Sequence, residues 1–331
     1  MAQPANYAAT RTAVDGWEVL CLSDAAHDAA VLVAPHLGNN AYSFRSRGRE
    51  VLWAPGCPSI LENGREFEGN PFMAPWANRL DRDGFEANGR TYALNGTLGN
   101  FLRDGEGLPI HGLLSHTRLW EVTALAADDG SGARATCRLE FWRHPALLAQ
   151  FPFAHAIEVT HRLRAGALSI ETRLENRSAE PMPVAIGYHP FLRIGDSPRG
   201  AWRVHLPARE ELEVTEGILP KGGRRPLGRP DPCALKELDV HHVLEGLERG
   251  PDGLAGARIE SDRVRVTVSQ DRGFDASVFY APPSLDYVCL EPMAATINAL
   301  NPLPGGGRNP VPTVPAGGSW TGVFSIHHEI H

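Results

Sequence analysis

The 331-residue sequence contains no apolar run that approaches the roughly 18 residues of a membrane-spanning helix. Its first residues, MAQPANYAAT, lack the basic and apolar regions of a secretory signal peptide. Positive charge is not in excess, because the net charge is −7. Nucleic acid and anionic membrane surfaces attract concentrated Lys and Arg, so neither is an expected partner. Together these absences predict a soluble, cytoplasmic protein.

The cysteines form no recognisable framework. They are odd in number, widely separated and without a Cys-x-x-Cys pair: Cys21, Cys57, Cys137, Cys233 and Cys289. This spacing predicts reduced thiols rather than disulfides or a zinc site. The sequence also lacks a GxSxG elbow, a P-loop and a GxGxxG motif after a strand, so these signatures of serine hydrolases and nucleotide-binding proteins are absent. We expect no metal and no cofactor.

Period-two alternation of apolar and polar residues dominates the sequence. Segments 135–141, 157–163, 168–174, 264–268 and 320–326 each place apolar residues on one side. Strands with one buried and one wetter face are typical of antiparallel sheets. Amphipathic helices are scarce, and 34 glycines and 27 prolines supply many turns. We predict an all-β protein built as a large antiparallel β-sandwich.

The chain is expected to form one domain over residues 1–331. Two average domains would also fit this length, but β-sandwiches often reach about 200–250 residues as one unit. The proline-rich stretches 220–232 and 301–315 are interpreted as loops, because strand patterns resume on both sides of each. The basic cluster from Lys221 to Arg229 is interrupted by glycine and proline and is interpreted as a solvated loop.

Two stretches place titratable side chains in stiff surroundings. In GYHPFLRI (187–194), His189 precedes a proline, which fixes the local backbone and therefore the direction of the imidazole. In VCLEPMAATINALN (288–301), Glu291 follows three apolar residues and precedes Pro292. Desolvation raises the pKa of such a carboxyl, which suits a general base near neutral pH. The alternatives are a buried histidine that ends a strand and a glutamate at the solvent end of one.

Other polar residues are candidates for holding a hydroxylated ligand. Asn78 and Arg79 offer donors and acceptors next to a predicted strand-turn-strand unit, although Arg79 could instead anchor a loop by pairing with a carboxylate. His111 precedes a glycine that permits close backbone approach. Asp239 follows an apolar position, but the His-His pair just after it is equally compatible with a surface loop.

Four motifs occur in a characteristic order: WANRLDRDGFEANGRTYALN, IHG, GYHPFL and LEPMAATINALN. In this order and at these separations they resemble the aldose 1-epimerase (galactose mutarotase) family, over a span from about Val31 to Ile326. The resemblance implies a large antiparallel β-sandwich of the galactose mutarotase type, with a sugar bound in an open cleft on one sheet. It also implies interconversion of the α and β anomers of an aldohexose without a cofactor.

The resemblance further assigns roles to the candidate residues. Glu291 would be the general base and His189 the general acid, while His111 would orient the sugar and polarise its ring oxygen. The remaining candidates would hold sugar hydroxyls: Asn78, Arg79 and Asp239. Mutarotation removes a proton from the anomeric hydroxyl and adds one to the ring oxygen. A base and an acid on opposite sides of the pyranose would therefore suffice, without metal or nucleotide.

Some positions depart from the family pattern and leave the identity of the sugar open. Leu113 stands where the best-known members have a second glycine, and Val278 stands where a glutamine is common. A phosphorylated hexose is therefore an alternative substrate, and its basic ligands would be Arg79, Arg82 and Arg103.

Two other functional classes are compatible with a β-sandwich. A glycoside hydrolase would use two carboxylates, for which Glu291 and Asp239 are the candidates. A non-catalytic carbohydrate-binding protein would use aromatic platforms such as Trp53 or Trp76 and no acid–base pair. We expect a small sugar as the ligand and either a monomer or a homodimer as the assembly.

Overall fold

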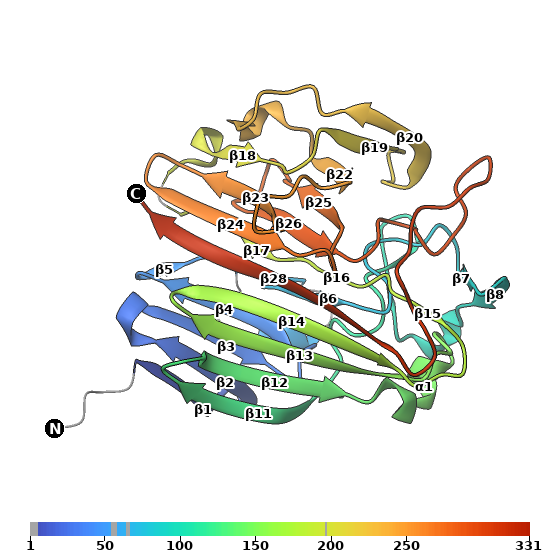
Figure 1. Cartoon of the computed structure of the whole chain (residues 1–331), viewed down its shortest axis with the longest axis horizontal. Helices are drawn as coiled ribbons and strands as arrows, with labels where there is room; N and C mark the ends of the chain where they lie inside the picture. Colours follow the sequence, from blue (N-terminus) through green and yellow to red (C-terminus); the bar gives the residue numbers. More distant parts are fainter. Residues whose placement is uncertain (1–5, 54–57, 64–66, 196) are drawn as a thin grey trace.

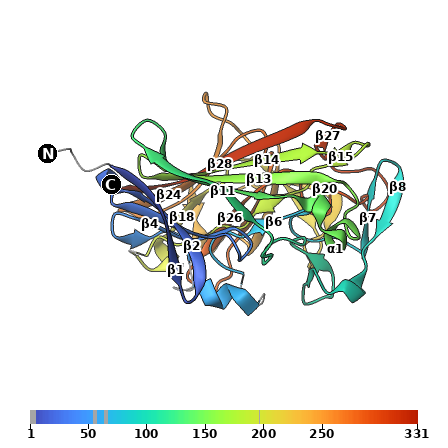
Figure 2. The same ribbon diagram turned by 90° about the horizontal axis from the view of Figure 1, so that it is seen from below.

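Strands are the predominant secondary structure in the computed structural model, which describes residues 6–53, 58–63, 67–195 and 197–331. Three sheets of nine, six and five strands carry the fold, and their strands pair antiparallel. Figures 1 and 2 show these sheets stacked in two layers, with the nine-stranded sheet forming one layer. The predicted antiparallel β-sandwich is therefore confirmed.

The nine-stranded sheet has the order β11 (Glu121–Asp128), β12 (Gly132–Leu139), β13 (His155–Arg164), β14 (Ala167–Asn176), β28 (Ser319–Ile330), β24 (Val264–Gln270), β23 (Ala255–Glu260), β18 (Arg203–His205) and β21 (Cys233–Ala234). All five segments with the predicted alternation lie in this sheet or directly at its end. For example, Ile170, Thr172 and Leu174 of β14 are buried, and the residues between them are more accessible. Burying a Val, Leu, Ile or Phe side chain stabilises the fold by about 1.5–3 kcal/mol.

Two sheets form the other layer. The six-stranded sheet consists of β22 (His241–Glu245), β25 (Ala276–Tyr280), β26 (Val288–Met293), β16 (Gly187–Tyr188), β6 (Phe72–Met73) and β17 (Phe191–Leu192), which also pairs with β26. The five-stranded sheet consists of β1 (Tyr7–Val14), β2 (Trp17–Asp24), β3 (Ala29–Ala34), β4 (Asn40–Ser46) and β5 (Arg49–Glu50). A bridge between Leu52 and Leu192 links the two sheets, so they form one nearly continuous layer.

Smaller elements decorate the sandwich. The two-stranded pairs are β7 (Gly84–Ala87) with β8 (Arg90–Ala93), β9 (Leu102–Arg103) with β10 (Pro109–Ile110), β15 (Met182–Pro183) with β27 (Thr313–Val314), and β19 (Glu210–Val214) with β20 (Pro220–Pro226). The helical elements are α1 (Pro145–Leu148) and the 3-10 segments Ala25–His27, Pro58–Asn63, Gly96–Leu98, Phe141–Arg143, Arg199–Ala201 and Leu235–Glu237. Within the described ranges, no helix is long and apolar enough to cross a membrane.

The main hydrophobic core lies between the two layers. It joins Leu290 and Phe279 of the six-stranded sheet to Ile170 and Phe324 of the nine-stranded sheet. Inside this core, the hydroxyls of Thr172 on β14 and Tyr188 on β16 lie 2.7 Å apart and form a buried hydrogen bond. Because an unpaired buried hydroxyl is costly, this bond also fixes how the two layers meet. The opposite face of the six-stranded sheet is left for other contacts.

Two local expectations have different outcomes. Asn88 and Gly89, predicted as turn residues, have positive φ angles of 51° and 71° and connect β7 to β8. The stretch around Lys221, predicted as a loop, instead forms strand β20, which pairs with β19. Alternation is weak in β20 because most of its side chains are accessible. Its pairing was therefore hidden from a pattern-based analysis.

The cysteines fit the expectation of reduced thiols. The four that the structure describes are free: Cys21, Cys137, Cys233 and Cys289. Cys57 lies outside the described residues.

Candidate active site

Glu291 and His189 lie on the face of the six-stranded sheet that points away from the main core. Alternation along β26 sends Leu290 into the main core, whereas Glu291 and Met293 lie on the opposite side. Met293 belongs to a second, smaller apolar cluster together with Met73 and Val278. Glu291 is thus a carboxylate in apolar surroundings on a fully buried strand, and its side chain is 1% exposed.

Strand register brings His189 opposite Glu291. Gly187 pairs with Met293 and Phe191 pairs with Cys289 on the same strand, so the intervening His189 falls across from Glu291. Residues directly opposite in an antiparallel pair project to the same face with Cβ atoms about 5 Å apart. The backbone N–H of His189 donates to the carbonyl of Pro71 (3.1 Å), which holds the turn against β6. This hydrogen bond adds to the stiffness that the proline is expected to give the His-Pro turn.

The two side chains meet. Nε2 of His189 lies 3.2 Å from Oε1 of Glu291, and the histidine is 6% exposed. Among the described residues, neither carboxyl oxygen of Glu291 nor Nδ1 of His189 has a hydrogen-bond partner of good geometry. Buried polar atoms are nearly always satisfied in folded proteins, so a set of unsatisfied ones marks a place where a ligand or water would bind.

Aromatic rings enclose the pair. Phe191 stacks on the His189 ring with centroids 4.6 Å apart, and the edge of Phe67 meets it at 5.1 Å. Phe67 also stacks on His111 at 4.5 Å, and the His111 and His189 rings lie edge to face at 5.4 Å. These rings remove water from both imidazoles while leaving the direction of each ring fixed.

Burial shifts the pKa values of the pair in opposite directions. It raises the pKa of Glu291 well above its usual range, and the charge of Arg79 offsets this only in part. It lowers the pKa of His189 to about 3, to which the charges of His241 and Arg79 also contribute. Burial likewise lowers the pKa of His111 well below its usual range. Burial therefore favours the uncharged form of both groups, a protonated carboxyl beside a neutral imidazole.

Arg79 is held at the rim of the site by two neighbours. Its Nε donates to Oδ2 of Asp104 (2.6 Å), and its Nη1 donates to Oδ1 of Asn78 (3.1 Å). The side chain of Arg79 remains 19% exposed, and its charge acts on both His189 and Glu291. The pair with Asp104 agrees with the expectation that Arg79 could anchor a loop by binding a carboxylate. The pairing also fixes the guanidinium while leaving its other N–H groups for a ligand.

His111 reaches the site through a strained backbone. Its φ angle is +60°, and the following Gly112 has a φ angle of +71°. The N–H of His111 donates to the carbonyl of Asn78 (2.9 Å), and Asn78 itself has a φ angle of +54°. Positive φ is costly for residues other than glycine, and it persists where the surrounding structure enforces it, most often at functional sites.

Replacing Gly112 with alanine is expected to disrupt this part of the site. A Cβ atom there would lie 2.1 Å from the carbonyl oxygen of Ala74. The matched control is Gly48→Ala, because Gly48 has a φ angle of +73° but open space around its Cβ direction. We expect Gly112→Ala to lower the free energy of unfolding in urea by about 2–4 kcal/mol more than Gly48→Ala. Equal losses in the two variants would contradict this close approach.

Asp239 stands apart from the other five predicted residues. Its side chain is 62% exposed, and its Oδ2 lies 3.3 Å from Arg229 and 3.7 Å from Arg225. No contact within the described part of the chain joins Asp239 to His189, Glu291 or the rings around them. A role for Asp239 in holding hydroxyls remains a prediction.

The surface loop that was considered after Asp239 is instead strand β22, and it brings an unforeseen residue to the site. His241 lies at the start of this strand, its ring stacks on Tyr280 at 4.6 Å, and Tyr280 approaches His189 at 6.3 Å. Its neighbour His242 points the other way, is buried and lies 2.6 Å from Glu211. In the sequence, the alternation of His241 with Val243 is the signal that could have placed His241 on this face of the sheet. In the structure, these two residues pair with Tyr280 and Val278.

Val278 is the other neighbour of Glu291 across the sheet. The register of β25 with β26 places the two residues opposite each other, and Val278 is 1% exposed. A valine cannot donate a hydrogen bond, whereas the glutamine common in the family could. Val278 thus adds to the apolar surroundings of Glu291, whose burial raises the pKa of its carboxyl.

Known proteins share both the sequence family and the fold. A family model described as aldose 1-epimerase matches residues 25–327. A galactose mutarotase-like protein from Clostridium acetobutylicum has a TM-score of 0.84 at 19% identity, covering 98% of this chain and 99% of that one. A galactose 1-epimerase from Lactobacillus acidophilus NCFM has a TM-score of 0.71 at 17% identity, covering 99% of each chain. A GalM/aldose epimerase homologue from C. elegans has a TM-score of 0.71 at 14% identity, covering 91% of this chain and 96% of that one.

At these identities the solved structures establish the fold, whereas the family match establishes the relationship. The match spans nearly the whole chain, including all four motifs and the His189–Glu291 pair. We conclude that this chain belongs to the aldose 1-epimerase family.

Proposed function

We propose that the protein is an aldose 1-epimerase that interconverts the α and β anomers of an unphosphorylated hexose. The observation that carries this proposal is the buried contact of 3.2 Å between His189 and Glu291, two groups able to exchange protons with a sugar. The more accessible side chains of Arg79, His111 and His241 form a polar rim around the pair. Such a rim suits a ligand with many hydroxyls.

In the proposed reaction, Glu291 as carboxylate takes the proton of the anomeric hydroxyl, and His189 as imidazolium gives a proton to the ring oxygen. The bond between C1 and the ring oxygen breaks, and an aldehyde forms at C1. Rotation about the C1–C2 bond exposes the other carbonyl face. Closure then reverses both proton transfers, so the enzyme ends with the protons it began with.

The direct contact changes one expectation about geometry. A base and an acid on opposite sides of the pyranose are expected for mutarotation, whereas His189 and Glu291 lie side by side. This arrangement is chemically sufficient because the anomeric oxygen and the ring oxygen are both bonded to C1. Neighbouring groups can therefore serve both atoms from one side of the sugar.

The contact also supports a simple route to the active protonation state. A protonated carboxyl beside a neutral imidazole and a carboxylate beside an imidazolium contain the same single proton. A small realignment of the 3.2 Å contact would let this proton pass from the carboxyl of Glu291 to the imidazole of His189 without exchange with solvent. Polar hydroxyls of a bound sugar would replace lost water and favour the charged pair.

Polarimetry tests the proposed activity. Freshly dissolved α-D-galactose and α-D-glucose relax slowly to their equilibrium rotations, and the protein is expected to accelerate at least one of them. An acceleration that is proportional to protein concentration and absent after heat inactivation would support the proposal. Rates equal to the blank for both sugars would refute epimerase activity on these hexoses.

We expect the pH dependence of kcat/KM to show a broad plateau. Activity requires one proton on the pair, and a second proton adds only near the His189 pKa of about 3. The last proton leaves at the pKa of Glu291, which burial raises well above its usual range. The rate above the blank should thus not fall as the pH is lowered from 7 to 5, where an ordinary histidine with a pKa near 6.5 would gain its proton. A change of several-fold over this range that follows the protonation of a histidine near pH 6.5 would contradict this picture of the pair.

Asp104→Asn is expected to weaken substrate binding more than turnover. The change replaces the acceptor for Arg79 Nε with an amide that can present a donor, while the other oxygen can still accept from the N–H groups of Glu106 and Leu108. We expect KM to rise about tenfold with kcat changed less than about threefold. The control is Asp83→Asn, which breaks the comparable pair with Arg103 at the surface. Equal changes in KM for both variants would argue against a positioning role.

The geometry favours this function over the three alternatives. The arginines proposed as phosphate ligands are each engaged by carboxylates, since Arg82 pairs with Asp81 and Arg103 pairs with Asp83. A hydrolase would need a second carboxylate near Glu291, and Asp239 is exposed and bound to arginines. A purely binding protein gives no reason for a buried acid–base pair.

A further inference from the structure

An apolar wall lies beside His189, the proton donor of the proposed reaction. Phe191 stacks on the His189 ring with centroids 4.6 Å apart, and the edge of Phe67 lies 5.1 Å from it. Both phenylalanines belong to one cluster of side chains on this face of the six-stranded sheet. We call its aromatic members the aromatic wall: Trp53, Phe67, Phe191, Tyr280 and Tyr287. Trp53, Phe67 and Tyr280 are half-buried, so part of the wall is accessible to a ligand.

The wall is least polar where it meets His189. Its polar groups are the indole N–H of Trp53 and the two tyrosine hydroxyls. The ring of Tyr280 lies 6.3 Å from that of His189, farther away than either phenylalanine. Tyr287 packs on Phe191 at 4.9 Å, and Trp53 packs on Tyr287 at 5.0 Å. The ring faces and edges closest to the imidazole are therefore hydrocarbon.

The segment next to His189 on the side away from Glu291 adds no polar side chain. The N–H of His189 donates to the carbonyl of Pro71 (3.1 Å). The N–H of Phe191 donates to the carbonyl of Gly69 (2.9 Å). The residues that pair with His189 and Phe191 are thus a proline and a glycine. Beyond the imidazole, a ligand would meet apolar groups.

The chemistry of the ring oxygen places C6 of a hexose beside this wall. The ring oxygen is bonded to C1 and C5, and C6 is attached to C5. In the proposed reaction, Glu291 serves the oxygen on C1 while His189 serves the ring oxygen. C5 and its substituent then lie past the ring oxygen, among the groups that surround His189. A hydroxyl there would exchange water for phenylalanine rings, whereas a methyl group would gain apolar contact.

We infer that the substrate is a 6-deoxyhexose whose C6 methyl group packs against Phe67 and Phe191. This inference rests on the proposed epimerase activity and adds a substrate class to it. The polar side chains of the rim remain for the ring hydroxyls: Arg79, His111 and His241. A hexose with a hydroxyl on C6 is expected to react more slowly without being excluded, because an apolar site rejects an added hydroxyl only moderately.

Three sets of three sugars test the substrate class. Within a set the ring hydroxyls are the same, and the group on C5 is hydroxymethyl, methyl or hydrogen. The first set is D-galactose, 6-deoxy-D-galactose and L-arabinose, and the second is D-glucose, 6-deoxy-D-glucose and D-xylose. The third set is L-galactose, 6-deoxy-L-galactose and D-arabinose, which has the opposite hand to the first. Polarimetry of each freshly dissolved anomer gives kcat/KM from the rate above the blank.

In at least one set, the wild-type kcat/KM should be about tenfold higher for the 6-deoxy sugar than for the sugar with a C6 hydroxyl. It should also be about fourfold higher than for the pentose, which lacks the methyl contact. If no accelerated set has the 6-deoxy sugar ahead of both other members, the substrate class is wrong while the epimerase activity stands. Absence of acceleration for every sugar would refute the epimerase activity and the inference with it.

Substitutions of Phe67 test whether the wall sets the preference. Phe67→Asn brings an amide to the position where C6 would lie, and should reduce the preference for the 6-deoxy over the 6-hydroxy sugar to about twofold or less. Phe67→Leu remains apolar and should keep most of the preference. The ratio of the two kcat/KM values is the readout, because a general loss of turnover lowers both values equally. Circular dichroism melts would verify that the variants fold.

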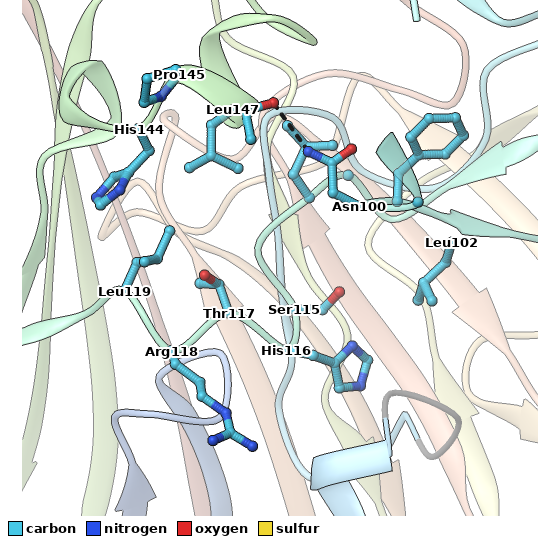
Figure 3. A pocket seen from close by; sticks show the side chains of 15 residues that line it. Asn100, Leu102, Ser115, His116, Thr117, Arg118, Leu119, His144, Pro145 and Leu147 are labelled. Atoms are coloured by element: carbon cyan, nitrogen blue, oxygen red, sulfur yellow. Dashed lines mark hydrogen bonds between the residues drawn. The ribbon is translucent and has the colours of Figure 1, made fainter. Parts of the chain in front are cut away.

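Phe101→Asn is the matched control. Phe101 is also a half-buried phenylalanine, and it lines the pocket that Figure 3 shows, between the labelled residues Asn100 and Leu102. The described lining of that pocket includes neither Glu291 nor His189. This variant should therefore keep the wild-type ratio. An unchanged ratio in Phe67→Asn, or a loss of the same size in Phe101→Asn, would overturn the contact between C6 and the wall.

Discussion

Glu291→Gln is expected to abolish most of the mutarotation while making the folded protein more stable. The amide keeps the shape of the side chain but cannot take a proton, so kcat should fall by about 10²–10⁴-fold. Neutral Nε2 of His189, 3.2 Å from the carboxyl, can still accept a hydrogen bond from the introduced amide. Polarimetry of freshly dissolved α-D-galactose, or of whichever hexose the wild type accelerates, measures the first effect.

The stability effect has a defined sign and pH window. The folded-state pKa of Glu291 is raised, so the unfolded chain ionises first as pH rises. The contribution of Glu291 to the free energy of unfolding is therefore fully present below its pKa in the unfolded chain, about 4.3. It is lost as the pH rises toward the pKa of Glu291 in the folded protein. Glu291→Gln has no such loss. The difference in unfolding free energy between this variant and the wild type should therefore grow from about pH 5 to pH 8.

Glu211→Gln is the matched control for this stability effect. Burial opposes ionisation of Glu211, but His242 at 2.6 Å and Arg225 at 2.8 Å lower the pKa of its carboxyl below the usual value. Its contribution to stability is present above the unfolded pKa and is lost as pH falls. Glu211→Gln should thus destabilise the protein at neutral pH, with a much smaller effect on kcat. A Glu291→Gln variant that is less stable than wild type at pH 8 would contradict the raised pKa.

His189→Asn should cost more turnover than His111→Asn. Only His189 contacts Glu291, whereas His111 is joined to the pair through its edge-to-face contact with the His189 ring. We expect kcat to fall by about 10²–10⁴-fold for His189→Asn, and by about tenfold for His111→Asn together with a higher KM. Initial rates by polarimetry over a range of sugar concentrations separate kcat from KM.

His161→Asn controls for the general cost of replacing a buried histidine. His161 lies on β13, is 1% exposed, and burial lowers its pKa to about 4, as for the candidate histidines. This variant should lose stability but keep the wild-type kcat. Equal losses of kcat in His189→Asn and His111→Asn would reject the ranking, and a comparable loss in His161→Asn would indicate damage to the fold rather than to the chemistry.

The sheet assignments were available from the sequence because alternation is a local property. The strands β12, β13, β14, β24 and β28 each bury one face, so each carries a period of two that can be recognised without knowing its neighbours. The short strands β16 and β17 around the His-Pro turn carry no such pattern, since two residues cannot show a period. Strand β20 is longer, but its accessible side chains hide it.

Tertiary structure alone decided which candidate side chains meet. His189 and Glu291 are 102 positions apart in the sequence, and only the shared register of β16 and β17 with β26 places them opposite each other. The same sheet brings in His241, whereas Asp239, two residues earlier, is paired with arginines at the surface. A motif specifies residue types and local backbone, but register and packing between distant strands set distances, burial and therefore pKa values.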